Sequence, residues 1–145
     1  WLVKNTPAAA GPAEAPAVRS TPDYTMARFA LERFDADGRL KVRVEGERLY
    51  RQRMGQLDLS CAQCHDERAG LRLAGALIPQ GHPNGYPLYR LQWQGMGTLE
   101  RRLRNCTVGV RAQPWAAGDA SWVALEAWLM QRAAGMPIES PAVRP

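Results

Sequence analysis

The chain has 145 residues, of which 46% are apolar and 23% are charged, and its formal net charge is +5. This composition is ordinary for one folded domain with an appended tail. The positive charge favours anionic partners such as an inorganic oxyanion or an acidic protein, but the basic residues are mixed with 14 acidic ones, which argues against nucleic-acid binding. No apolar run approaches the roughly 18 residues of a membrane helix, so we expect no membrane insertion.

The beginning of the chain differs in composition from the rest. Residues 1–22 are dominated by Pro and Ala without a hydrophobic period, which predicts a flexible tail or linker. We expect residues 23–145 to form the folded domain. No signal peptide is visible and the first residue is Trp1, not Met, so we expect a mature or truncated product.

The segment before the first cysteine carries weak structural signals. Apolar residues near helical spacing predict a short helix at residues 26–34. The pair Asp37-Gly38 indicates a turn, and the alternation in residues 41–44 indicates a short strand. A further helix is expected over residues 46–57.

The second half of the chain carries clearer signals. Residues 70–97 are rich in Gly and Pro and predict a long ordered loop. One helix is expected from its N-cap Thr98 to Gly109, and another from its N-cap Ser121 to a stop at Gly135. The apolar face of the first of these helices consists of Leu99, Leu103 and Cys106. These elements predict a mostly α fold with long ordered loops. Taken together with the motif described next, they predict a single c-type cytochrome domain.

The sequence Cys61-Ala-Gln-Cys64-His65 has the spacing of a haem-attachment motif. Two thiols two residues apart at the start of a helix reach the two haem vinyl groups, and the adjacent imidazole then lies under the iron. A redox dithiol would be expected within a βαβ pattern, which is absent, and a zinc site would need two more ligands, for which only Cys106 and His82 remain. We therefore predict one covalently bound haem c.

The residues alone leave the other axial ligand of the iron open. Met96, Met136 and His82 follow the motif far enough along the chain, and electron-carrying cytochromes of this kind often use Met. Cys106 is the fourth candidate, although a small buried residue on an apolar helix face would explain it as well. Arg102 stands one turn before Cys106 and would favour a thiolate. Thiolate ligation would lower the haem potential, which suits chemistry at sulfur.

Five segments within residues 46–145 resemble one known family. They occur in order and read GQLDLSCAQCH, QGHPNGYPLYRLQWQ, RRLRNCTVGVRAQP, WVALEAWL and GMPIESPAVRP. Together they resemble the C-terminal haem domain of SoxA, the larger subunit of the SoxAX cytochromes of bacterial thiosulfate oxidation. The resemblance implies a mostly helical cytochrome c domain.

The resemblance also implies roles for individual residues. His65 would be one axial ligand and Cys106 the other, as a thiolate or persulfide, with Cys106 as the catalytic group. Arg102 would contact thiosulfate, and Arg104 and Arg111 are further candidates. The implied activity is that of a haem-dependent L-cysteine S-thiosulfotransferase, which joins thiosulfate oxidatively to a cysteine of a SoxYZ-like carrier protein.

The resemblance further implies a setting for this activity. Electrons would leave through haem to a SoxX-like cytochrome subunit, and c-type haem assembly implies the periplasm. Family members carry a second cytochrome-like domain before this one, which is expected to be missing here. Residues 1–45 contain no cysteine, so no second covalent haem is expected there.

Two other functions remain open from the sequence. The first is a simple periplasmic electron-transfer cytochrome c with a Met or His sixth ligand, in which Cys106 packs in the core and the arginines form a docking surface. The second is a haem-based sensor, which only the haem motif supports.

Overall fold

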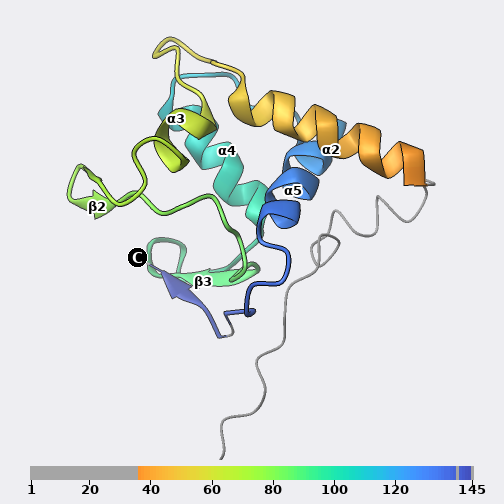
Figure 1. The fold of residues 1–145 in the computed structure, drawn as a ribbon. Coiled ribbons are helices and arrows are strands. Elements are labelled where there is room, and N and C mark those ends of the chain that lie inside the picture. The colour runs from red at the N-terminus through yellow and green to blue at the C-terminus, as the bar shows by residue number, and fades with distance from the viewer. Residues whose placement is uncertain (1–35, 140, 145) are drawn as a thin grey trace, which may run out of the picture.

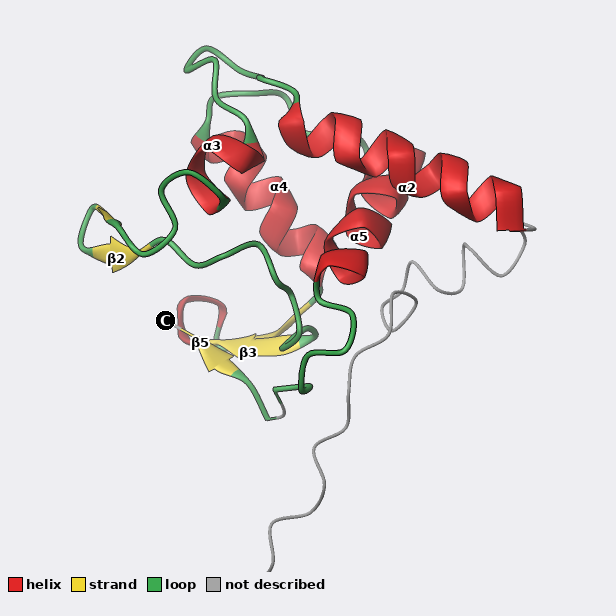
Figure 2. Ribbon diagram, in the orientation of Figure 1, coloured by secondary structure: helices red, strands yellow, loops and turns green. Residues whose placement is uncertain are grey.

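The computed structural model describes residues 36–139 and 141–144. The tail expected at residues 1–22 and the helix expected at residues 26–34 lie outside these described residues. In chain order, the elements are α2 (Ala36–Arg51), α3 (Cys61–His65), β1 (Arg72–Leu73), β2 (Ala76–Leu77), β3 (Leu88–Arg90), the 3-10 helix η1 (Leu91–Trp93), β4 (Gly95–Gly97), α4 (Leu99–Gly109), α5 (Ala120–Arg132) and β5 (Val143–Arg144). The α-helices gather on one side and the sheet containing β3 lies on the other (Figures 1 and 2).

Helix α2 begins earlier than the sequence indicated. The turn expected at Asp37-Gly38 and the strand expected at residues 41–44 are both wrong, because the helix contains all of these residues. Val42 packs against the core, whereas Val44, two residues later, is exposed. The spacing of Val42 from the buried Leu49 is seven residues, which is two helical turns and not a strand alternation.

The packing of α2 against α5 depends on close backbone approach. A Cβ at Gly46 would lie 2.0 Å from the Ala124 carbonyl oxygen, so only glycine fits this crossing. The same interface contributes most of the core, in which Trp122 and Tyr50 are each 1% exposed. The buried core cluster consists of Leu49, Tyr50, Ala62, Leu99, Trp122, Ala124, Leu125 and Leu129.

Helix α4 agrees closely with the sequence prediction, and α5 (Ala120–Arg132) agrees except at its two ends. Thr98 caps α4, since its side-chain oxygen accepts from the Arg101 amide at 3.2 Å, and α4 ends at Gly109 as expected. The cap of α5 was predicted wrongly: Asp119 is the N-cap, and its carboxylate accepts from the Ser121 amide at 2.8 Å. Asp and Ser are both favourable N-cap residues, and Asp119 is the N-cap because it directly precedes the first helical residue, Ala120.

The loop predicted at residues 70–97 contains regular structure. β1 and β2 form an antiparallel hairpin, and β3 pairs antiparallel with β4 and parallel with β5. These strands are only two or three residues long, and the partner β5 lies near the end of the chain. Such short strands carry no alternation that a sequence reading could detect. The fold is therefore a helical domain with a small sheet. No helix among the described residues is long and apolar enough to span a membrane.

Candidate functional site

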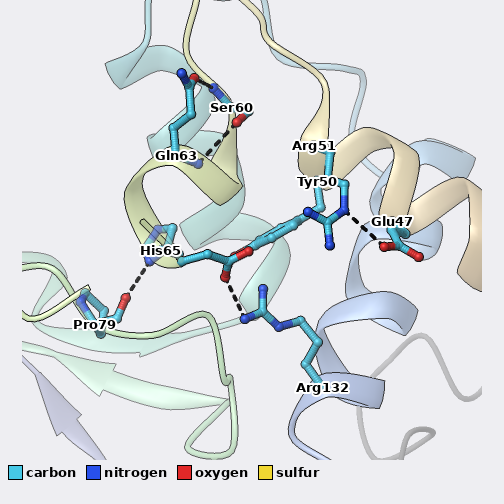
Figure 3. A network of polar contacts seen from close by, with 9 residues as sticks. Glu47, Tyr50, Arg51, Ser60, Gln63, His65, Pro79 and Arg132 are labelled. Atoms are coloured by element: carbon cyan, nitrogen blue, oxygen red, sulfur yellow. Dashed lines mark hydrogen bonds and ion pairs between the residues drawn. The ribbon is translucent and has the colours of Figure 1, made fainter. Parts of the chain in front are cut away.

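The haem-motif residues lie on α3, and a capping box starts this helix. The buried Ser60 accepts a hydrogen bond from the Gln63 amide at 3.2 Å, and the Gln63 side chain accepts one from the Ser60 amide at 2.9 Å (Figure 3). This reciprocal pair turns an extended chain into a helix at Cys61. Cys61 and Cys64 are consequently about one turn apart, on the same side of α3.

His65 ends α3 with its ring held in one orientation. Its Nδ1 lies 2.7 Å from the Pro79 carbonyl oxygen (Figure 3). A carbonyl oxygen only accepts hydrogen bonds, so Nδ1 is the donor in this contact and Nε2 is the ring nitrogen left to bind a metal. A backbone carbonyl on the far nitrogen is the usual support of a metal-bound histidine, because it fixes the ring and raises its basicity. His65 is therefore prepared to bind a metal through Nε2.

Cys106 belongs to α4 and lies within electrostatic range of this motif. The pKa of the Cys61 thiol is raised to about 11, first by burial and then by the Cys106 and Cys64 thiols. Leu103, one turn before Cys106 on α4, packs against the same core as Cys61, so α4 presents the face that the sequence predicted. No disulfide bond joins any two of the three cysteines.

Arg102 is the predicted arginine whose surroundings connect it with Cys106. Burial raises the pKa of the Tyr86 hydroxyl, the Arg102 and Arg90 guanidinium groups lower that pKa, and the Cys106 thiol raises it. Tyr86 is thus within electrostatic range of Arg102, Arg90 and Cys106. The other two predicted arginines are placed differently: Arg104 donates to the Trp115 carbonyl at 3.3 Å, and Arg111 is exposed in the turn after α4 with a φ of 58°.

Arg90 is a site residue that the sequence analysis missed. It is half-buried at the end of β3, and its Nε is buried without a hydrogen-bond partner among the described residues. Its guanidinium lies 5.2 Å from the centre of the Trp93 ring, and β5 places Arg144 directly beside it in the sheet. Arg144 is neutralised by an ion pair with Glu139. Arg90 belongs to a strand of three residues, and so short a strand has no pattern by which the sequence could reveal it.

The other candidate ligands named from the sequence are less well placed to bind the same iron as His65. Met96 is 61% exposed on β4, so its thioether faces solvent in large part. His82 is half-buried, and burial followed by the nearby Arg132 lowers its pKa. Met136 follows α5 and is half-buried. Among residues 36–139 and 141–144, no three His, Cys, Asp or Glu side chains are grouped to hold a bare metal ion.

The donor set fits a c-type haem. Two thiols stand one turn apart on a capped helix, and an imidazole with a free Nε2 follows immediately. A third thiol approaches from α4. The surroundings are apolar and aromatic, since Ala62 is buried and Trp115 packs edge-on against Trp122 with ring centres 4.6 Å apart.

This helical fold, with Cys-x-x-Cys-His on a short helix packed against the helix pair α2 and α5, defines a cytochrome c domain, and haem c is the cofactor such a domain implies. The chain belongs to the SoxA/TsdA cytochrome c domain family, whose pattern matches residues 45–138.

Individual relatives agree with this family. L-cysteine S-thiosulfotransferase subunit SoxA of Paracoccus pantotrophus is 38% identical over 99 residues, or 68% of this chain and 34% of that protein. The subunit of the same name from Allochromatium vinosum is 36% identical over 102 residues, 69% of this chain and 36% of that protein. A chain of SoxXA from P. pantotrophus has a TM-score of 0.70 and 36% identity, covering 72% of this chain and 40% of that one.

These comparisons concern one domain of longer proteins. The chain spans about a third of the length of the curated relatives it matches. The similarity therefore defines the family and fold of this domain, and the activity of the whole relatives is a separate question.

Proposed function

We propose that this domain binds one haem c covalently through thioether bonds from Cys61 and Cys64. His65 is the proximal axial ligand through Nε2, and Cys106 is the second axial ligand. The observation that carries this proposal is that α3 and α4 meet at one core cluster, against which both Cys61 and Leu103, one turn from Cys106, are packed. The hydrogen bond from His65 to Pro79 supports the role of Nε2.

We further propose that the domain takes part in L-cysteine S-thiosulfotransferase chemistry, the activity in the names of its relatives. One thiosulfate and one carrier-protein thiol lose a proton and two electrons in total, and the product is an S–S bond between the cysteine sulfur and the outer sulfur of thiosulfate. Haem, when bound, supplies the route by which these electrons leave. Cys106, as a thiolate, would first form an S–S bond with the outer sulfur of thiosulfate, with loss of the two electrons. The carrier thiolate would then attack that outer sulfur, which breaks the bond to Cys106 and releases its thiolate. A persulfide at Cys106 would react in the same way through its outer sulfur.

The arginines near Cys106 would hold the sulfonate end of thiosulfate. A guanidinium presents its N–H donors in a planar fork that suits an oxyanion. Arg102 is on the same face of α4 as Cys106, and Arg90 has a buried Nε free to donate, so these two are the proposed contacts. Arg104 and Arg111 are proposed only to add positive charge around the entrance, since one is bonded to a backbone carbonyl and the other is exposed.

The partners follow from the same chemistry. A SoxX-like cytochrome subunit would receive the electrons, and the similarity to a chain of SoxXA supports this assignment. A SoxYZ-like carrier would present the thiol that is modified. The periplasm is the proposed location because c-type haem is attached to proteins there. A plain electron-transfer cytochrome is the weaker hypothesis, because the exposed Met96 is poorly placed as a ligand.

The test of this function is a Cys106→Ala variant in an assay that couples thiosulfate to the carrier thiol. The variant keeps the Cys61–Cys64–His65 segment, so haem should remain attached at the wild-type level, as judged by the pyridine haemochrome spectrum. Turnover should fall to background, because the nucleophile is absent. Wild-type turnover in Cys106→Ala would refute the proposed catalytic role.

A further inference from the structure

One carboxylate joins three helices directly behind the proposed haem ligand. Asp66 follows His65 and is the C-cap of α3. Its Oδ1 accepts a hydrogen bond from the Tyr50 hydroxyl on α2 at 2.8 Å and another from the Arg132 guanidinium on α5 at 2.7 Å. The Arg132 guanidinium also lies over the Tyr50 ring, 4.8 Å from its centre. Figure 3 shows Tyr50 and Arg132 converging beside His65.

The Tyr50 hydroxyl also lies near the loop that holds the histidine ring. A Cβ added at Gly81 would lie 3.1 Å from the Tyr50 oxygen and 3.6 Å from the His65 Cβ, so glycine leaves room here for both side chains. Gly81 stands two residues after Pro79, whose carbonyl accepts from His65 Nδ1. The Tyr50 hydroxyl is therefore bonded to the residue that follows His65 and is placed beside the loop that orients the imidazole.

Burial makes this contact more than a surface ion pair. Tyr50 is 1% exposed, whereas the Asp66 and Arg132 side chains are 32% and 20% exposed. Burial and the Asp66 carboxylate both raise the pKa of Tyr50, so its hydroxyl remains a donor at every physiological pH. An isolated pair between Asp66 and Arg132 would add little rigidity, but a buried phenol bonded to the same oxygen fixes the carboxylate in place.

We propose that Tyr50, acting with Asp66 and Arg132, is a positioning residue for His65, which sets the orientation of the imidazole and the strength of its hydrogen bond to Pro79. The proposal rests on the haem site proposed above. It predicts that the network influences the iron indirectly, since a weaker bond at Nδ1 makes the imidazole a less basic ligand. Less electron donation to ferric iron raises the reduction potential.

The test compares Tyr50→Phe with the wild type in the haem-loaded protein. The substitution keeps the buried ring and removes only the hydroxyl. Asp66→Asn is the second variant, because it retains the side-chain shape but weakens both bonds. Arg48→Gln is the matched control: it lies on the same helix and breaks an ion pair with Glu45 at 2.6 Å that is exposed and has no part in the network.

Three measurements separate positioning from general stability. Tyr50→Phe should raise the reduction potential, shift the g values of the ferric electron paramagnetic resonance spectrum, and speed hydrogen exchange at His65 Nδ1 by at least roughly fivefold, as expected for a weakened hydrogen bond. Asp66→Asn should change all three in the same direction, and Arg48→Gln should change none. If Tyr50→Phe matches Arg48→Gln in all three, the positioning role is wrong.

The exchange measurement also distinguishes this proposal from the haem assignment. A wild-type protein that carries no haem would refute the proposed function. Exchange at His65 Nδ1, followed by nitrogen-labelled nuclear magnetic resonance, can be compared among the same variants in that case. Equal exchange rates in wild type and Tyr50→Phe would then overturn the network, and faster exchange in the variant would support it.

Discussion

His65 and Cys106 reach the proposed haem from different elements and are prepared in different ways. The Pro79 carbonyl accepts from His65 Nδ1, which leaves Nε2 as the ring nitrogen that would bind the iron. Cys106 is half-buried on α4, with Arg102 one turn away. A nearby guanidinium favours the thiolate over the thiol, and ferric iron would favour it much more. The two proposed ligands are thus an imidazole nitrogen and a cysteine sulfur.

Arg102 provides a prediction at the scale of the single residue. Arg102→Gln removes the cation beside Tyr86 and Cys106. Loss of a charged hydrogen bond costs about 1.5–3 kcal/mol, and partial exposure of Arg102 places the expected effect at the lower end. We therefore expect kcat/KM for thiosulfate to fall roughly tenfold.

The control for Arg102 is another arginine of the same segment. Arg111→Gln removes an exposed charge and should lower kcat/KM by less than about threefold, through the general field alone. Steady-state kinetics at constant ionic strength compare the two variants. Equal effects of Arg102→Gln and Arg111→Gln would mean that the arginines act only by long-range attraction.

At the scale of elements, the crossing of α2 and α5 carries the site. α5 supplies Arg132 to the network behind His65, and α2 supplies Tyr50. Both helices are held together where Gly46 meets the backbone of Ala124. A change in this crossing would move the groups on which α3 rests. The stability of this helix pair is therefore the basis of the geometry at the haem motif.

Gly46→Ala tests the crossing directly. The new Cβ would lie 2.0 Å from the Ala124 carbonyl oxygen and 2.7 Å from the Ala124 carbonyl carbon. These are backbone atoms, which cannot move away without shifting the helix. We expect a loss of about 3 kcal/mol in the free energy of unfolding, measured by urea denaturation.

A matched glycine serves as the control for this prediction. Gly109→Ala lies in α4 with no atom within 4 Å of the new Cβ, so helix propensity should leave stability unchanged or raise it by up to about 1 kcal/mol. Similar stability of Gly46→Ala and Gly109→Ala would show that α2 and α5 separate easily.

The sequence predicted those elements whose signals are local. The caps and apolar face of α4, and the helix at the haem motif, follow from Thr98, Cys106 and the Cys-x-x-Cys-His spacing. The early start of α2 was missed because Val42 and Val44 resemble a strand unless it is known that only Val42 meets the core. Tertiary packing, which the sequence does not show, favoured the helical period over the strand period.

In the candidate site too, residues with local sequence signals could be predicted, whereas residues placed by tertiary contacts could not. The spacing of Cys61, Cys64 and His65 identifies them as a haem motif. Cys106 and Arg102 share a helix face, but spacing left other candidate ligands open, and only the family resemblance singled out Cys106. Arg90 could not be found, because its place depends on β3 pairing with β5 from the end of the chain. The contact of Tyr50 with Asp66 joins residues on two helices, and no local pattern predicts it.

At the scale of the whole molecule, three structural units carry the residues of the proposed haem site. α3 and the loop to Pro79 hold the Cys-x-x-Cys-His motif, α4 carries Cys106, and the sheet of β3, β4 and β5 carries Arg90 and Arg144. The basic side chains of the sheet and α4 agree with the net charge of +5 and with an anionic substrate. The relatives are longer than this chain, so any contacts that their other parts make with partners lie outside this domain.

The central claim is that His65 and Cys106 both bind the haem iron. The most direct measurement is the electron paramagnetic resonance spectrum of the oxidised, haem-loaded protein, recorded for wild type and Cys106→Met. We predict a low-spin signal of the thiolate type in the wild type, and its replacement in the variant by a signal of the histidine–methionine type. A histidine–methionine signal that is the same in both proteins would contradict the account and leave Cys106 as a packing residue of a plain electron carrier.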